Sequence, residues 1–202
     1  MGRGNLFRTL ALTLVVLAPG GLFGQSESGT PIEVRNVRYG YVRPMGGSDN
    51  WLEVTVELNV RGTPVGNPQF VDSVRVALSL SLRNPLEGDS DFVFFRSDAE
   101  ASTLESGAAR FRFYLPPAVV RRYQISGEPF AFAVDVWIDG RPIAQTAAAV
   151  SSVLANADAL RSFRDRVAQD GVRNDGILLP QFKTPFLIEY ARDTPAFVWR
   201  GR

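Results

Sequence analysis

The 202-residue chain contains no histidine and no cysteine, and Lys183 is its only lysine. Histidine is the usual general base near neutral pH, and cysteine is the most reactive protein nucleophile. Without them the chain cannot assemble the common hydrolase triads, a Cys/His dyad or the usual zinc sites. A stabilising disulfide is excluded as well. We therefore expect a protein that is not an enzyme, carries no cofactor or metal, and is held together by packing.

Carboxylates are the common acid–base groups that remain. Asp89 and Asp91 lie in a glycine-containing turn, but their spacing does not match an EF-hand calcium loop. Glu53 and Glu57 share one face of a predicted strand, whereas a glycosidase needs two carboxylates opposed across a cleft. Lys183 lacks the S-x-x-K motif of Ser-Lys catalysis, and no glycine-rich phosphate loop is present. A carboxylate-based hydrolase therefore ranks third among the functional hypotheses.

The first residues have the three-part organisation of a secretory signal peptide. Arg3 and Arg8 lie in a segment without acids, and an apolar run from Leu10 to Ala18 follows. A helix needs about 20 apolar residues to span a bilayer, so this shorter run favours a cleaved leader over a stable membrane anchor. An uncleaved tether is the alternative. We place the signal peptide at residues 1–24 and expect export to the periplasm, the cell surface or the medium.

The net charge of the chain argues against two classes of partner. The formal net charge is +1, and it becomes about −1 when Arg3 and Arg8 leave with the leader. Proteins that bind nucleic acids or anionic membrane surfaces need an excess of clustered positive charge. We therefore expect neither a nucleic acid nor a membrane surface as the partner.

Apolar and polar residues alternate along much of the chain from Pro31 to Ala149. This period of two is typical of half-buried antiparallel strands, in which successive side chains point to opposite faces. Asp139-Gly140 follow such a strand directly and predict a type I′ hairpin turn. Strands are predicted at residues 32–42, 51–61, 74–82, 91–95, 110–115, 130–138 and 142–150.

About seven strands separated by turn residues, with no predicted helix among them, indicate an antiparallel immunoglobulin-like β-sandwich. A single sheet closed on itself is the alternative architecture. The sandwich domain is predicted at residues 25–150, without the inter-sheet disulfide of antibody domains. Residues 151–202 are expected to pack on the same domain as one amphipathic helix followed by an extended tail. Leu160, Phe163 and Val167 form the apolar stripe of that helix, and Asn156 or Ser152 is its expected N-cap.

The tail from Ile177 to Trp199 is rich in apolar residues and is interrupted by three prolines. Prolines at that density prevent a long helix and restrict strands to sheet edges. The tail therefore either covers the core of its own domain or contacts a partner. Its candidate interaction residues are Phe182, Phe186, Tyr190, Phe197 and Trp199.

Several turn and strand-end segments are similar to those of a bacterial family. They are Phe111-Arg-Phe-Tyr-Leu-Pro-Pro, Gly127-Glu-Pro-Phe-Ala-Phe, Asp135-Val-Trp-Ile-Asp-Gly and the tail segment that begins Thr184-Pro-Phe. With these segments the chain resembles exported immunoglobulin-like proteins encoded beside type IV pilus machinery in Verrucomicrobia-like bacteria. The resemblance implies an accessory role in the periplasm or on the cell surface, and it supplies no functional residues.

Two functional hypotheses lead from these features. The first is an exported, non-enzymatic β-sandwich that acts by protein contact in a pilus, secretion or envelope assembly, with its oligomeric state left open. The second is a carbohydrate-binding module, because sandwich domains often stack sugars on exposed aromatic rings. Trp137 is the leading candidate for such stacking, with Tyr39, Tyr41 and Tyr114 as further candidates.

Overall fold

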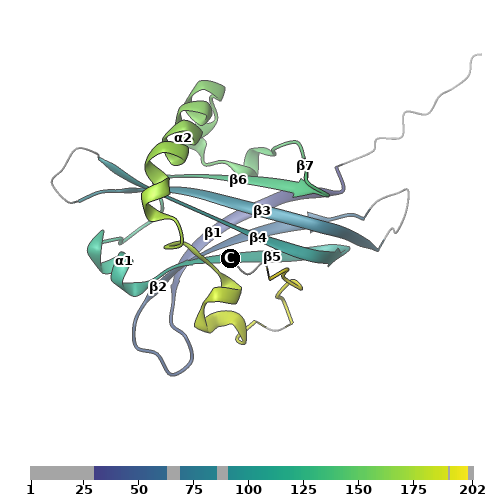
Figure 1. Cartoon of the computed structure of the whole chain (residues 1–202), viewed down its shortest axis with the longest axis horizontal. Coiled ribbons are helices and arrows are strands. Elements are labelled where there is room, and N and C mark those ends of the chain that lie inside the picture. The colour runs from purple at the N-terminus through teal and green to yellow at the C-terminus, as the bar shows by residue number, and fades with distance from the viewer. Residues whose placement is uncertain (1–29, 63–68, 86–90, 191, 200–202) are drawn as a thin grey trace, which may run out of the picture.

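The computed structural model describes residues 30–62, 69–85, 91–190 and 192–199 (Figure 1). The predicted signal peptide, residues 1–24, and Asp89 lie outside the described residues. The described chain folds into two antiparallel sheets of four strands each, with a helix near the C-terminus. The architecture is an all-β sandwich, as the alternating sequence pattern predicts, and it is built from two separate sheets rather than one closed sheet.

The first sheet has the strand order β1-β2-β5-β8, and the second has the order β4-β3-β6-β7. The first consists of β1 (Ile32–Val42), β2 (Trp51–Val60), β5 (Gly107–Leu115) and β8 (Leu179–Pro180). The second consists of β4 (Phe92–Glu105), β3 (Phe70–Arg83), β6 (Ala131–Ile138) and β7 (Arg141–Pro142). The helices are α1 (Pro117–Arg122) and α2 (Ala157–Asp170). Single 3-10 turns form η1 (Ala147–Ala149), η2 (Ser152–Leu154), η3 (Gly171–Asn174), η4 (Gln181–Lys183) and η5 (Pro185–Leu187).

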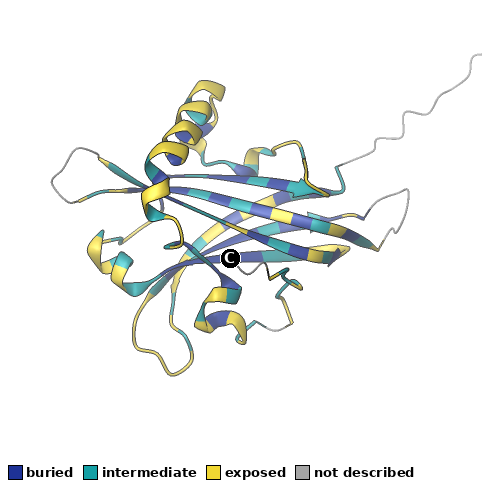
Figure 2. Cartoon of the chain, viewed as in Figure 1, coloured by how far each residue is buried: buried dark blue, intermediate teal, exposed yellow. Residues whose placement is uncertain are grey.

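The core lies between the two sheets and follows the predicted alternation. Along β2 and β3 the apolar residues of one face are buried, and Figure 2 shows buried and more exposed residues alternating along these strands. The contributors from these two strands are Leu52, Val54, Val56, Leu58, Val60, Val71, Val74, Val76, Leu78, Leu80 and Leu82. Branched side chains on both inner faces thus supply the packing that the missing disulfide does not.

The hairpin after β6 has the predicted turn but not the predicted returning strand. Asp139 and Gly140 have φ values of 50° and 73°, which is the positive-φ pair that a type I′ turn requires. The predicted extent of the returning strand, residues 142–150, is wrong. Only Arg141–Pro142 (β7) pairs with β6 before the chain leaves the sheet. The alanine-rich stretch forms the turn η1 instead, and Val150 makes a single bridge to Ala133.

Several other parts of the structure differ from the sequence prediction, and β3 and β5 begin at Phe70 and Gly107 rather than at 74 and 110. Strand β4 continues to Glu105, ten residues beyond the predicted end at 95, and pairs with β3 along its whole length. The short helix α1 lies between β5 and β6, where no helix was predicted. Phe130 precedes β6 and is partly exposed, so it does not share the buried face of that strand.

Helix α2 packs on the outer face of the second sheet (Figure 1). Its N-cap is Asn156, whose Oδ1 accepts a hydrogen bond from the Asp158 backbone N–H at 2.7 Å. Phe163 and Val167 are buried against Phe94 of β4, so the predicted apolar stripe faces the sheet. None of the helices in the described part of the chain combines the length and the apolar character needed to cross a membrane.

The chain after α2 covers one edge of each sheet. Strand β8 pairs with β5, with Leu179 opposite Tyr114. Further on, the Val198 N–H donates to the Glu100 carbonyl at 2.7 Å, and the Ser102 N–H donates to the Ala196 carbonyl at 2.9 Å. Uncovered edge strands invite pairing with other chains, so the tail protects the parts of the two edges with which it pairs.

Candidate functional site

The structure divides the five candidate tail residues between interior and surface. Phe186 is fully buried, and Phe182 and Phe197 pack against the main core. The rings of Phe197 and Phe111 are 5.6 Å apart, which places the tail directly on β5. Trp199 is 67% exposed, and its ring meets that of Phe182 edge-on at 5.5 Å. The aromatic tail therefore contributes both to the core and to the surface.

Phe186 sits in an aromatic cluster on the outer face of the first sheet. Its ring stacks on Tyr114 at 4.4 Å with an interplanar angle of 5°, and the ring of Trp51 meets it edge-on at 5.6 Å. The Tyr114 hydroxyl donates a 2.7 Å hydrogen bond to Oε2 of Glu53. Burial and the neighbouring Glu53 raise the pKa of Tyr114. Sequence alternation places Tyr114 on the solvent face, but the tail covers it completely.

The candidate residue Tyr190 lies over a buried arginine in the same region. The Arg112 guanidinium is 4.1 Å from the Tyr190 ring centre and 3.6 Å from Asp193. Asp193 also pairs with Arg110 at 2.7 Å, and Arg110 in turn contacts Glu57 at 3.1 Å. These contacts link the tail to charged residues of β5 and β2, which the alternating strand pattern places on the solvent-facing side.

The ion-pair network lowers the pKa of Glu57, the carboxylate that contacts both Arg38 and Arg110. Burial would raise the pKa of Glu57, but hydrogen bonds and charge from Arg110 and Arg38 lower it overall. A cleft of about 340 Å³ opens beside this network, between Tyr39 and Asp193. Arg112 Nη1 is buried without a hydrogen-bond partner at this cleft. Three arginines and two acids line this cleft, so the charged residues of its lining include one more base than acids.

A larger groove, with a volume of about 510 Å³, runs over β3 and the edge of β4. The half-buried Trp137 lines it, and the Arg75 guanidinium lies 4.2 Å from the indole ring centre. Arg96 and Asp175 form a two-point ion pair at the groove, with both N–O distances at 2.8 Å. Tail residues including Leu179, Pro180, Phe182 and Lys183 form the opposite wall. Trp137 therefore belongs to a recess that also carries charged groups of both signs.

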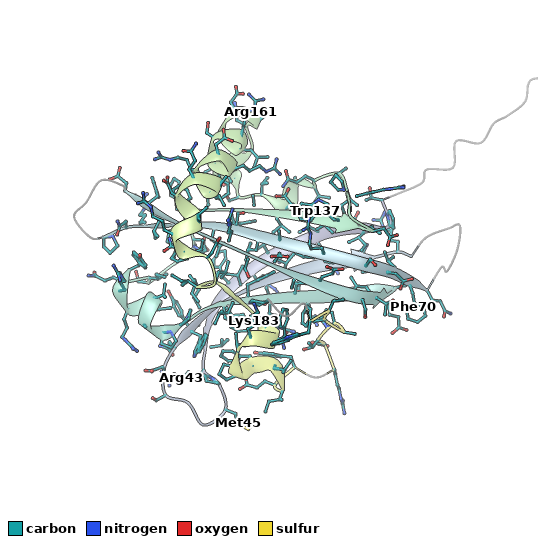
Figure 3. All side chains as sticks on the ribbon, viewed as in Figure 1. Arg43, Met45, Phe70, Trp137, Arg161 and Lys183 are labelled. Carbon is teal, nitrogen blue, oxygen red and sulfur yellow. The ribbon has the colours of Figure 1, made fainter. Side chains whose placement is uncertain are left out.

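A third surface feature is a set of exposed apolar residues in two segments that a hydrogen bond joins, and we call these residues, Met45, Leu187 and Ile188, the apolar patch. Their side chains are 87%, 46% and 77% exposed, respectively. The Met45 backbone N–H donates to Oε1 of Glu189 at 2.6 Å, which joins the loop between β1 and β2 to the tail. Figure 3 shows Met45 at the end of that loop, well away from Trp137 on β6. Sequence reasoning missed this patch, because its two segments lie more than 140 residues apart.

The described residues contain no group of three or more acidic side chains arranged to hold a metal ion. Glu53 and Glu57 are not free surface carboxylates, because each is bound to a side chain of β5. The structure thus brings together a buried aromatic cluster, a mixed-charge groove and an exposed apolar patch. The groove and the patch are features of binding surfaces.

No family model matches the chain, and no curated protein matches it. A crystal structure of a protein from Akkermansia muciniphila has the same fold, with a TM-score of 0.62. The two chains are 13% identical, and the match covers 84% of this chain and 94% of the other. The likeness is one of fold. Akkermansia muciniphila belongs to the Verrucomicrobia, and its protein supports the sandwich fold that the resemblance implies.

Proposed function

We propose that the protein is an exported, non-enzymatic binding module that acts by protein contact in a pilus, secretion or envelope assembly. The observation that carries the proposal is the apolar patch of Met45, Leu187 and Ile188. Export rests on the signal-peptide pattern of residues 1–24, and the assembly rests on the resemblance to proteins encoded beside pilus machinery. The non-enzymatic role rests on the absence of histidine and cysteine, which the common hydrolase sites require.

The patch has the composition of a contact surface. Large apolar side chains clustered on a surface mark interaction sites more often than isolated ones do. The patch is also held in place, because Glu189 fixes the Met45 backbone beside η5. Polar groups lie next to it in the same loop, where the Arg43 Nε donates to Asn50 Oδ1 at 2.7 Å. An apolar centre beside polar groups fits a protein partner with an apolar surface of its own.

A comparison of variants in the native envelope tests this proposal. We expect the wild-type protein to recover one specific partner under gentle extraction and Met45→Ser/Ile188→Ser to lose it. The matched control is Val153→Ser/Val172→Ser, which removes two exposed apolar side chains elsewhere on the surface. The control should retain the partner. Recovery of the wild-type protein alone and monomeric, or equal recovery of the partner by both double variants, would contradict the proposal.

The second candidate function is carbohydrate binding at the groove. Trp137 supplies an aromatic face there, and the nearby Asp98 supplies a carboxylate. The Arg75 guanidinium already lies over the ring, so a sugar would have to use the other face or displace it. Glycan-array binding that disappears in Trp137→Ala and persists in Trp199→Ala would favour this function. Absence of binding to any envelope or dietary polysaccharide would exclude it.

A further inference from the structure

The edge of β4 is covered on both sides of a short gap. At one end the Asn174 side chain donates to the Phe94 carbonyl at 2.8 Å. At the other end the Val198 N–H donates to the Glu100 carbonyl at 2.7 Å. Between these contacts lie Arg96 and Asp98. No described residue pairs with their backbone groups on the side away from β3.

The direction of these backbone groups follows from the geometry of antiparallel strands. Alternate residues of such a strand turn both the N–H and the C=O to the same neighbour. Phe94, Glu100 and Ser102 direct theirs away from β3, toward Asn174 and the tail. Arg96 and Asp98 have the same parity, so their N–H and C=O groups also point outward. The edge therefore offers two donors and two acceptors in the spacing of a strand.

The larger groove lies along this gap. Arg96, Ser97 and Asp98 line it on one side, and Leu179, Pro180 and Phe182 line it on the other. Its volume of about 510 Å³ is within the range of ligand clefts, roughly 300–1,000 Å³. Three extended residues span about 10 Å, which is the length needed to pair with Arg96 and Asp98, whose outward backbone groups pair with no other described residue.

We propose that this edge binds an extended segment of a partner protein as an added antiparallel strand. The chain itself shows that the edge accepts one, because residues 196–198 already pair with β4 next to the gap. Main-chain hydrogen bonds give such a site its affinity, and the alternate side chains give it specificity. The site is separate from the apolar patch, so it goes beyond the proposed function.

The surroundings of the gap define the chemistry of the segment. A residue opposite Ser97 would direct its side chain toward Leu179 and Phe182, so an apolar residue fits there. A residue opposite Asp98 would lie on the outer face, where a basic side chain pairs with the exposed carboxylate. The partner segment is therefore extended, with a basic residue followed by an apolar one.

The test uses seven-residue peptides selected from a random library displayed on phage, with the full chain as bait. Asp98→Pro removes the outward N–H, and proline is tolerated on an edge strand where the N–H faces solvent. Asp98→Ala is the matched control, because it removes the carboxylate and keeps the N–H. We expect selected peptides to bind Asp98→Pro at least tenfold more weakly than wild type and Asp98→Ala no more than threefold more weakly. Equal binding to wild type and Asp98→Pro, or no enriched peptide, would overturn the proposal.

Amide hydrogen exchange gives a readout that does not depend on the variants. In the free protein the amides of Arg96 and Asp98 should exchange faster than those of Ser97 and Ala99, which face β3. The bound peptide should slow the first pair selectively. The proposal would be wrong if the amides of Arg96 and Asp98 exchanged slowly in the free chain and this protection were lost when residues 200–202 were removed. That result would show that the chain occupies the edge itself.

The two proposals can fail separately. Met45→Ser/Ile188→Ser should bind the selected peptides as well as wild type, because the patch lies outside the groove. Asp98→Pro should still recover the envelope partner if that partner binds the patch.

Discussion

Phe186→Ala provides the sharpest test of how the tail is anchored. The Phe186 ring is fully buried between the rings of Tyr114 and Trp51. Truncation of a buried phenylalanine to alanine costs about 3–5 kcal/mol, because it removes apolar contact and leaves a cavity. Because Phe186→Ala also removes one stacked and one edge-on aromatic contact, we expect the free energy of unfolding to fall by about 4 kcal/mol. For a domain of this size that loss corresponds to a fall in melting temperature of about 8–16 °C.

Urea unfolding followed by tryptophan fluorescence measures this loss. Trp51 lies 5.6 Å from Phe186, so its emission also reports whether the tail has left the sheet. The control is Ile188→Ala, two residues further along and largely exposed, which should change the free energy of unfolding by less than about 0.5 kcal/mol. The urea midpoint should fall for Phe186→Ala with little change in the slope of the transition. A loss smaller than about 1 kcal/mol would refute the inference that the tail is part of the core.

Three further predictions concern the helix cap and two titrating groups. Asn156→Ala should lower the free energy of unfolding by about 1 kcal/mol in a thermal melt, and Ser152→Ala should leave it unchanged. Burial, followed by a hydrogen bond to Glu128, raises the pKa of Tyr39 to about 12. The folded protein therefore keeps a proton that the unfolded chain loses, so stability should fall as the pH rises above about 10, with late ionisation in an ultraviolet titration. Burial opposes the ionisation of Glu57, but Arg110 and Arg38 lower its pKa overall. The stability that the charged Glu57 gives to the folded protein should therefore be lost as the pH falls below about 4.5. Arg110→Gln should reduce this acid-dependent loss of stability.

The parts of the fold that could be predicted from sequence are those with large side chains on one face. Strand β2 alternates leucine and valine with polar residues, and its predicted and observed limits differ by one residue. The second half of β4 was missed because its core positions hold Ala99 and Ala101, whose small side chains give a weak apolar signal. Pairing with β3 along its full length extends the strand. Tertiary pairing here overrides a weak local preference.

The covered outer face of the first sheet could not be predicted for a different reason. Arg112 and Tyr114 alternate with core residues and so belong by period to the solvent face. They are buried because Phe186 and Tyr190, more than 70 residues later in the chain, lie over them. Local periodicity identifies the two faces of a strand, but it cannot show that both are covered. Aromatic residues spaced by prolines in the tail were the available signal that such a cover exists.

The division of the tail between core and surface decides how its function can be tested. Deletion of residues 177–202 would remove Phe186 from the core, uncover the edges of β5 and β4, and take away Ile188 at the same time. A lost interaction in that deletion would therefore say nothing about where the partner binds. Ile188→Ser changes the exposed side chain alone. If the patch is the contact surface, this variant should melt like wild type and still lose the partner, whereas Phe186→Ala should lose stability first.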